Sequence, residues 1–201
     1  MAMTQIVALK LLAFFAIFVV AAFLLPIWRL WRREKVNAFV VPFDDTAEGV
    51  IGRSLRLTLL ALPILLAAIA MGLPPDSVGS LPWLAGPAPR FAGWTLLLVS
   101  LAWVIAGQTR MGKSWRVGID SQARPPLVQD GVFALSRNPI FLGVRAGLLG
   151  VFLVLPNAAT LAALLLGEAM IQVQVRLEEA HLARVFPRQY EAYRRKVRRW
   201  L

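Results

Sequence analysis

Two polar stretches hold the side chains that could do chemistry in this sequence. The first, Ser136-Arg-Asn-Pro-Ile-Phe-Leu-Gly-Val-Arg145, opens an otherwise apolar run, and the second contains the adjacent acids Glu178 and Glu179. Arginine donates well to anionic oxygens, and carboxylates accept from cations. A helix that only had to cross lipid would need neither stretch. Two interpretations follow: basic residues flank a membrane helix and Arg145 snorkels, or the polar groups hold a charged ligand at the membrane surface.

Several kinds of active site are excluded by what the sequence lacks. It has no Walker loop and no G-x-G-x-x-G, H-E-x-x-H or G-x-S-x-G motif. With one histidine, His181, and no cysteine, we predict no metal site, no disulfide and no cysteine nucleophile. The polar residues gather at one membrane boundary instead of lining a path through the bilayer. This favours a polar ligand and a lipid-soluble partner over a channel or transporter.

The elements that must position these residues are membrane helices. Of the 201 residues, 58% are hydrophobic and only 16% are charged. Uncharged apolar runs of 17 residues occupy 11–27, 57–73 and 91–107, each close to the roughly 20 residues that cross a bilayer core. Two shorter apolar runs, 146–155 and 158–167, follow. We therefore predict an all-α, polytopic integral membrane protein with about five transmembrane helices and a C-terminal helical hairpin.

The distribution of basic residues predicts the orientation of these helices. Of 22 Lys and Arg, 20 lie in 29–56, 110–145 and 176–199, three segments that the apolar runs separate. The positive-inside rule places all three in the cytosol. We expect an external N-terminus, a cytosolic C-terminus and a bacterial inner membrane location. The first run lacks a small-x-small cleavage site, so we expect no cleaved signal peptide. Contacts with membrane lipids explain the net charge of +11 better than nucleic acid does. The oligomeric state stays open.

Residue counting around Pro156-Asn157 predicts how the last two apolar runs pair. Arg145 lies 11.5 positions before the midpoint of this dipeptide, and Glu168 lies 11.5 positions after it. In an antiparallel hairpin the two would sit at one depth, about 17 Å below the tip. An ion pair there would let both charges enter the membrane at low cost, provided that helix rotation turns them toward each other.

Helix boundaries can be predicted at two further places. Asp44, Asp45 or Thr46 is expected to cap the second long helix. Pro187 is expected to end the fifth helix and to begin a new one. That last helix, residues 188–201, is predicted to be amphipathic and to lie at the membrane interface.

Both polar stretches resemble the motifs of a known superfamily. Residues 130–143 resemble the pattern G-x-[YF]-x-x-x-R-[HN]-P-x-[YF]-x-G, and residues 178–199 resemble E-E-x-x-L-x-x-x-F-G-x-x-Y-x-x-Y-x-x-x-V-x-R. These are the hallmarks of the isoprenylcysteine carboxyl methyltransferase and phospholipid methyltransferase superfamily. The resemblance covers about 107–201. We predict one membrane domain over 1–201, with N-terminal transmembrane helices in 1–106 and a cofactor-binding, catalytic half in 107–201.

The resemblance implies an enzyme that binds S-adenosylmethionine at the cytosolic face and methylates a lipophilic or small acceptor. Arg137 would pair with the carboxylate of this cofactor, and Glu178 or Glu179 with its ammonium group. Alignment and desolvation would carry most of the rate. The implied catalytic residues are Arg199 and Glu179. The implied cofactor-binding residues are Arg137, Asn138, Pro139, Phe141, Gly143, Glu178, Glu179, Tyr190 and Tyr193.

Three positions depart from the superfamily pattern. Asn138 stands where histidine is usual, Phe141 where tyrosine is usual, and Pro187 where glycine is usual. A ring nitrogen and a hydroxyl are thereby missing, and the acceptor stays open among carboxylates, thiols, amines and phospholipid headgroups. Competing functions are a non-enzymatic membrane protein on the same scaffold and an NADPH-dependent, sterol-type reductase.

Structural interpretations of the same residues also stay open. Arg137 is also explained as a positive flank, Asn138-Pro139 as a helix start and the two glutamates as a solvated helix face. The tyrosines are also explained as interface residues and His181 as a bystander. The final arginines could contact lipid headgroups.

Overall fold

Helices form the regular structure of the described part of the chain, residues 2–35, 46–115 and 126–201 of a computed structural model. Within these residues the only β structure is an isolated bridge between Ser80 and Asn157. The prediction of an all-α protein is confirmed. The helices are α1 (Met3–Val19), α2 (Leu25–Glu34), α3 (Ala47–Ala70), α4 (Pro87–Met111), α5 (Pro139–Val154), α6 (Ala158–Val185) and α7 (Pro187–Lys196).

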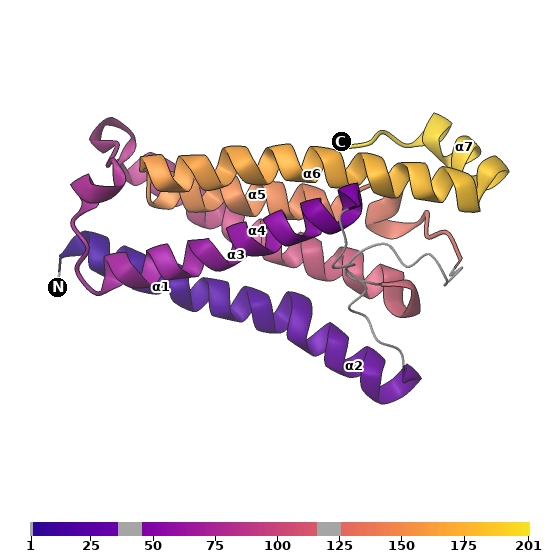
Figure 1. Cartoon of the computed structure of the whole chain (residues 1–201), viewed down its shortest axis with the longest axis horizontal. Helices are drawn as coiled ribbons and strands as arrows, with labels where there is room; N and C mark the ends of the chain where they lie inside the picture. Colours follow the sequence, from indigo (N-terminus) through magenta and orange to yellow (C-terminus); the bar gives the residue numbers. More distant parts are fainter. Residues whose placement is uncertain (1, 36–45, 116–125) are drawn as a thin grey trace.

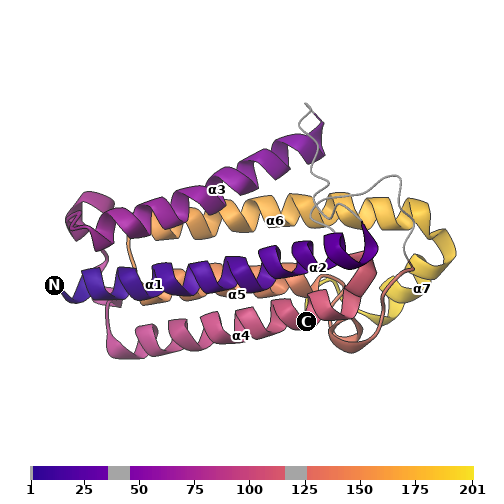
Figure 2. The ribbon, with the colours of Figure 1, turned by 90° about the horizontal axis from the view of Figure 1, so that it is seen from below.

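The long helices run alternately in opposite directions along one axis. A π-helical turn, Val20–Leu24, joins α1 to α2, and α3, α4, α5 and α6 each reverse the direction of the helix before (Figures 1 and 2). In the described residues, three helical segments are long and apolar enough to cross a membrane: Met3–Arg32, Pro87–Met111 and Ala158–Val185. The apolar part of α3, Leu60–Ala70, and α5 are shorter. The chain is an integral membrane protein, with three full-length candidate spans and two shorter apolar helices where the sequence predicted about five spans.

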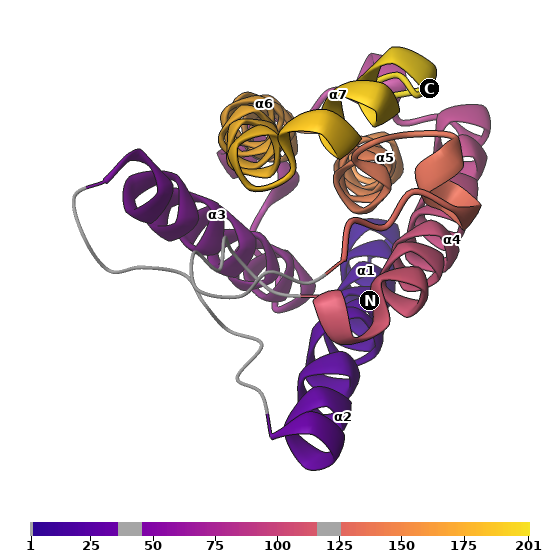
Figure 3. The ribbon, with the colours of Figure 1, turned by 90° about the vertical axis from the view of Figure 1, so that its right-hand side faces the viewer.

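The first membrane helix changes its hydrogen-bond pattern because of a proline. Pro26 has no N–H to donate to the carbonyl of Ala22, four residues earlier. That carbonyl accepts instead from the side-chain amide of Gln108, a buried polar residue of α4. The N–H of Leu25 reaches the carbonyl of Val20, five residues back, which is the π-helical pattern. Beyond this turn α2 diverges from the bundle (Figure 3).

Small residues allow α4 and α5 to form the most extensive helix contact of the described chain. A Cβ on Gly93 would lie 2.8 Å from the carbonyl oxygen of Gly150, and a Cβ on Gly143 would lie 2.6 Å from a methyl carbon of Val104. The Ser100 hydroxyl donates to the Gly143 carbonyl at 2.7 Å. Such residues let membrane helices approach closely and gain dispersion energy where lipid supplies no hydrophobic drive. Gly143, a predicted cofactor ligand, therefore lies in a helix interface.

The hairpin between α5 and α6 turns at the predicted dipeptide. Asn157 caps α6, since its side-chain oxygen accepts from the N–H of Thr160 at 2.9 Å and its own N–H donates to the Thr160 hydroxyl at 3.2 Å. Arg145 and Glu168 face each other, with 2.6 Å between Nε and Oε2. The rotation that the sequence left open thus brings the two charges together, and the predicted ion pair is confirmed.

The other predicted helix boundaries are confirmed in part. The Thr46 hydroxyl caps α3 by accepting from the N–H of Gly49 at 3.2 Å, while Asp44 and Asp45 lie outside the described residues. Helix α6 ends at Val185 and α7 begins at Pro187, as predicted. The expectation of one helix over 188–201 is wrong, because α7 ends at Lys196 and the chain then becomes extended.

Candidate functional site

A buried carboxylate joins the two polar stretches of the sequence. Glu179 lies near the C-terminal end of α6 and is 8% exposed. Its oxygens accept from Arg137 Nη2 at 3.1 Å, Asn138 Nδ2 at 2.9 Å and Arg199 Nη2 at 2.9 Å. These four side chains, called the Glu179 cluster below, come from the start of α5, the end of α6 and the C-terminal tail. The structure thus brings together four of the predicted site residues.

The tail, residues 197–201, is held by the segment that precedes α5. The backbone N–H of Arg137 donates to the carbonyl of Arg198 at 3.0 Å, and its Nη1 donates to the carbonyl of Val197 at 2.7 Å. The Ser136 hydroxyl donates to the carbonyl of Arg199 at 3.1 Å. Backbone carbonyls that a helix would have paired internally are paired here with another segment. These hydrogen bonds replace helical ones in the tail, and they place Arg199 beside Glu179.

Asn138 begins α5 without capping it through its side chain. Pro139 occupies the first helical position, where its missing N–H leaves no bond unmade. The Asn138 amide donates to Glu179 and, at 3.4 Å, to the carbonyl of Arg199. Its backbone N–H donates to the hydroxyl of Ser136 at 3.1 Å. Asn138 therefore marks the helix start as predicted, while its side chain belongs to the Glu179 cluster.

The two tyrosines of α7 face the protein interior and not the membrane interface. Tyr190 and Tyr193 are each 3% exposed, and their rings meet edge to face with centroids 6.2 Å apart. Tyr193 donates to the carbonyl of Phe133 at 2.7 Å, whereas the Tyr190 hydroxyl lies beside the guanidinium of Arg137, itself a donor, and meets no acceptor among the described residues. Burial raises the pKa of Tyr190 to about 12, and the negative charge of Glu179 adds to the effect. Both hydroxyls stay protonated at neutral pH, and Tyr190 keeps an unused donor.

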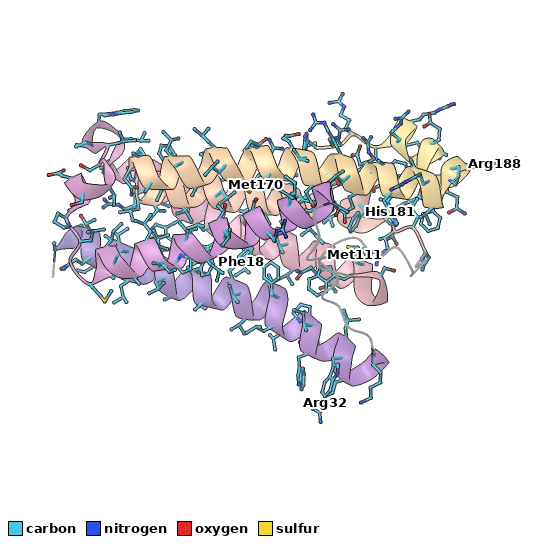
Figure 4. All side chains as sticks on the ribbon, viewed as in Figure 1. Phe18, Arg32, Met111, Met170, His181 and Arg188 are labelled. Atoms are coloured by element: carbon cyan, nitrogen blue, oxygen red, sulfur yellow. The ribbon has the colours of Figure 1, made fainter. Side chains whose placement is uncertain are left out.

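The other predicted residues lie outside the hydrogen-bonded cluster. Pro139 is fully buried, and Phe141 packs in the apolar contact between α5 and α6. Glu178 is half-buried and makes no hydrogen bond or ion pair with a described residue. His181, labelled in Figure 4 with Arg188, lies toward the same end of α6 as the cluster. No hydrogen bond joins His181 to the residues that the structure describes.

Trp200 is the site residue that sequence reasoning missed. Its ring packs against the apolar contact between α5 and α6, and the guanidinium carbon of Arg145 lies 4.2 Å from the ring centroid. The cation–π contact ties the tail to the ion pair inside the hairpin. Ser136, fully buried, was also missed, although it directly precedes Arg137. No spacing rule predicts a contact between Trp200 and Arg145, which lies 55 positions earlier. In the sequence, only its position next to Arg199 relates Trp200 to the site.

The Glu179 cluster has a closed side and an open side. Two arginines and one glutamate give it a net charge of +1. The side chains of Arg137 and Glu179 are 8% and 10% exposed, whereas that of Arg199 is 34% exposed. Arg137 was expected to bind the carboxylate of a ligand, but its guanidinium donates to Glu179 and to carbonyls of the tail. The open side instead presents Arg199, whose Nη1 has no described acceptor while Nε and Nη2 contact Glu179. An anionic group could bind there.

Comparison with known protein families agrees with this arrangement. The phospholipid methyltransferase family model matches residues 89–189, just over half of the chain, from the first turn of α4 to the first turn of α7. The chain belongs to the phospholipid methyltransferase family. This confirms the superfamily that the two motifs indicated and supports a membrane methyltransferase as the class of enzyme. In this phospholipid methyltransferase family member, Arg137, Asn138 and Glu179 lie inside the matched segment and Arg199 follows it. A search of curated proteins finds no match.

Proposed function

We propose that the protein transfers a methyl group from S-adenosylmethionine to a lipophilic or small acceptor at the cytosolic face of a bacterial inner membrane. One observation carries the proposal: both motifs of a methyltransferase family meet at the buried carboxylate of Glu179. The cytosolic orientation rests on the positive-inside rule, applied to the three basic segments.

The residues around the cluster fit the groups that this cofactor carries. Its carboxylate suits the open side of Arg199, which adds to the net positive charge of the cluster. Its ammonium group suits Glu178, which has no described partner. The Tyr190 hydroxyl beside the cluster meets no acceptor among the described residues, and leaving such a buried donor unpaired costs about 1–3 kcal/mol. A polar ligand explains these unused groups better than a solvated helix face does.

Each residue of the cluster has a separate task in the proposed reaction. Bound S-adenosylmethionine supplies a methyl group on a sulfonium, which needs little acid–base help to leave. Arg199 is the proposed catalytic residue, since it alone in the cluster is partly open toward a ligand or acceptor. We assign Glu179 a positioning role because its oxygens are already occupied by Arg137, Asn138 and Arg199. The apolar faces of α5 and α6 beside the cluster would exclude water and admit an acceptor from the bilayer. Alignment and desolvation then lower the barrier.

Isothermal titration of the purified protein with S-adenosylhomocysteine and with NADPH tests the proposal. We expect S-adenosylhomocysteine to bind and NADPH not to bind. Arg199→Ala should weaken binding by roughly 1.5–3 kcal/mol, as expected for a lost charged hydrogen bond. Arg198→Ala is the matched control, because the neighbouring side chain is exposed and only its carbonyl contacts Arg137. NADPH binding would favour a reductase, and binding of neither compound would favour a non-enzymatic protein.

A further inference from the structure

A second pocket lies at the end of the bundle opposite to the Glu179 cluster. It is lined by the first turns of α1 and α4, the end of α3, the loop between α3 and α4 and the α5–α6 turn. Most of its lining is apolar, with Val7, Ile69 and Val154 among the contributors. Arg90, one turn into α4, supplies the one cationic side chain of this lining. The pocket is therefore separate from the site described above.

Arg90 is unusual because its guanidinium has no partner in the described protein. Its Nε is buried without an acceptor, and no hydrogen bond or ion pair joins the side chain to any residue that the structure describes. Asp76 is the acidic residue nearest to Arg90 in the sequence, and its carboxylate accepts from the hydroxyl of Ser80 at 2.8 Å. A buried donor of a charged group left unpaired costs about 1–3 kcal/mol or more. The terminal nitrogens of the same guanidinium are not among the buried atoms and have no partner among the described residues, so an external acceptor would bind to them.

Backbone hydrogen bonds between the α3–α4 loop and the α5–α6 turn build part of the pocket wall. The N–H of Leu81 donates to the carbonyl of Pro156 at 3.1 Å, and the N–H of Ala158 donates to the carbonyl of Gly79 at 2.8 Å. Gly79 has a φ of +67°, which favours glycine, and a Cβ there would lie 2.8 Å from the Cβ of Ala158. These bonds hold the loop in one shape.

The charge around the pocket favours an anion. The three basic segments hold 20 of the 22 Lys and Arg, and Arg90 is one of the two outside them. Helix ends contribute partial charges of both signs here, because the N-termini of α1, α4 and α6 and the C-termini of α3 and α5 all lie at this end of the bundle (Figure 1). Arg90 is the one charged side chain of the pocket lining, so the formal charge of the lining is positive. Trp83, 79% exposed in the adjoining loop, is typical of the lipid–water interface. Phosphate groups of lipids lie at that level of a membrane.

We propose that this pocket binds a phosphate group through the guanidinium of Arg90. Arginine pairs with phosphate through two parallel N–H···O bonds, which a planar guanidinium with no protein partner is free to make. The apolar lining contributed by Val7 and Val154 would accommodate the glycerol and first acyl carbons of a phospholipid. Free inorganic phosphate offers the same oxyanion without the apolar part. Neither the Glu179 cluster nor methyl transfer takes part in this proposal.

Thermal unfolding of the purified protein in dodecyl maltoside, a detergent without phosphate, tests the proposal. We expect dioleoylphosphatidylglycerol to raise the Tm and dioleoylglycerol, which has the same chains without the phosphate, not to raise it. Sodium phosphate is compared with sodium chloride at equal ionic strength to show whether the free anion suffices. A rise with either phosphate compound supports the site and names the source of its ligand.

Variants show whether Arg90 is responsible for the effect. Arg90→Gln should weaken the phosphate-dependent shift so that about tenfold more ligand is needed, in line with one lost charged hydrogen bond. Lys10→Gln removes an equal charge from exposed surface of α1 and should leave the shift unchanged. Ala85→Phe would fill the pocket without changing its charge and should also abolish the shift. Equal shifts in wild type and Arg90→Gln, or no shift with either phosphate compound, would overturn the proposal.

Discussion

The Arg145–Glu168 pair gives the sharpest prediction about stability. Glu168 lies ten residues into α6, or about 15 Å from its start, which is close to the middle of a hydrocarbon core. The side chains of Arg145 and Glu168 are 28% and 35% exposed, so each depends mainly on the other for its counter-charge. Glu168 also accepts from Gln172 at 2.7 Å, and Arg145 also contacts Trp200.

The structure predicts which of the two single substitutions lowers the free energy of unfolding more. Arg145→Leu leaves a carboxylate at hydrocarbon depth with one amide partner, a cost of about 2.5–3.5 kcal/mol, and also removes the cation–π contact. Glu168→Leu leaves the arginine on the Trp200 ring with a side chain long enough to snorkel, so we expect about 1.5–2.5 kcal/mol. The double substitution leaves no charge and should cost only about 0–1 kcal/mol. The coupling between the two residues, the sum of the single costs minus the double cost, is then about 3–6 kcal/mol.

Equilibrium unfolding of the four proteins in mixed micelles measures this cycle. A second cycle on Arg110 and Asp130 is the matched control, because this bidentate pair is 52% and 64% exposed. Its coupling should be about 0–1 kcal/mol, as for other exposed ion pairs. Additive costs for Arg145→Leu and Glu168→Leu would show that the two charges do not compensate each other inside the membrane, contrary to this prediction.

Three further predictions follow from the packing, the tyrosines and the topology. Gly93→Ala should lower the free energy of unfolding by about 1–3 kcal/mol, because its Cβ would meet backbone atoms of α5. Gly86→Ala should be tolerated, because the nearest atom to its Cβ would lie 3.5 Å away. Unfolding in mixed micelles measures both. Tyr190 and Tyr193 are the only tyrosines, and burial holds both above the ordinary pKa of 10, Tyr190 at about 12. The neutral forms are favoured in the folded state, so stability is full below pH 10 and falls as the pH rises toward 12; tyrosinate absorbance that titrates near pH 10 in folded protein would contradict this. A cysteine at Ser77, exposed and placed in a chain without native cysteine, should react with impermeant reagent in intact cells, and reaction only after lysis would reverse the orientation.

Local rules predicted the parts of the fold that depend on neighbours in the sequence. Thr46 caps α3, Pro187 begins α7 and the hairpin turns at Pro156-Asn157 because capping and proline effects act within one helical turn. Counting from the turn also gave the common depth of Arg145 and Glu168. Whether the two side chains point toward each other could not be predicted, because that depends on how α5 and α6 rotate against each other and against α4.

The part of the site that could not be predicted depends on contacts between distant segments. Residues 197–201 continue the amphipathic spacing of α7, yet they are not helical, and Ser136 and Arg137 pair with their carbonyls. Tyr190 has the composition of an interface residue, and only the docking of α7 buries it. The motifs did identify Arg137, Asn138, Glu179 and Arg199, which the fold brings into contact. Their roles in cofactor binding and catalysis stay predictions.

The proposed function requires that Arg199, held by Glu179, supports methyl transfer from S-adenosylmethionine. Membranes that contain the wild-type protein, Arg199→Ala or Arg198→Ala, at equal amounts of folded protein, would be incubated with methyl-labelled S-adenosylmethionine, and the label in the lipid-soluble and small-molecule fractions would be counted. We expect wild type and Arg198→Ala to give more labelled product than membranes without the protein, and Arg199→Ala to lose about 10-fold or more of that labelling. Label that stays at the level of membranes without the protein, or equal labelling by Arg199→Ala and wild type, would contradict the proposed function.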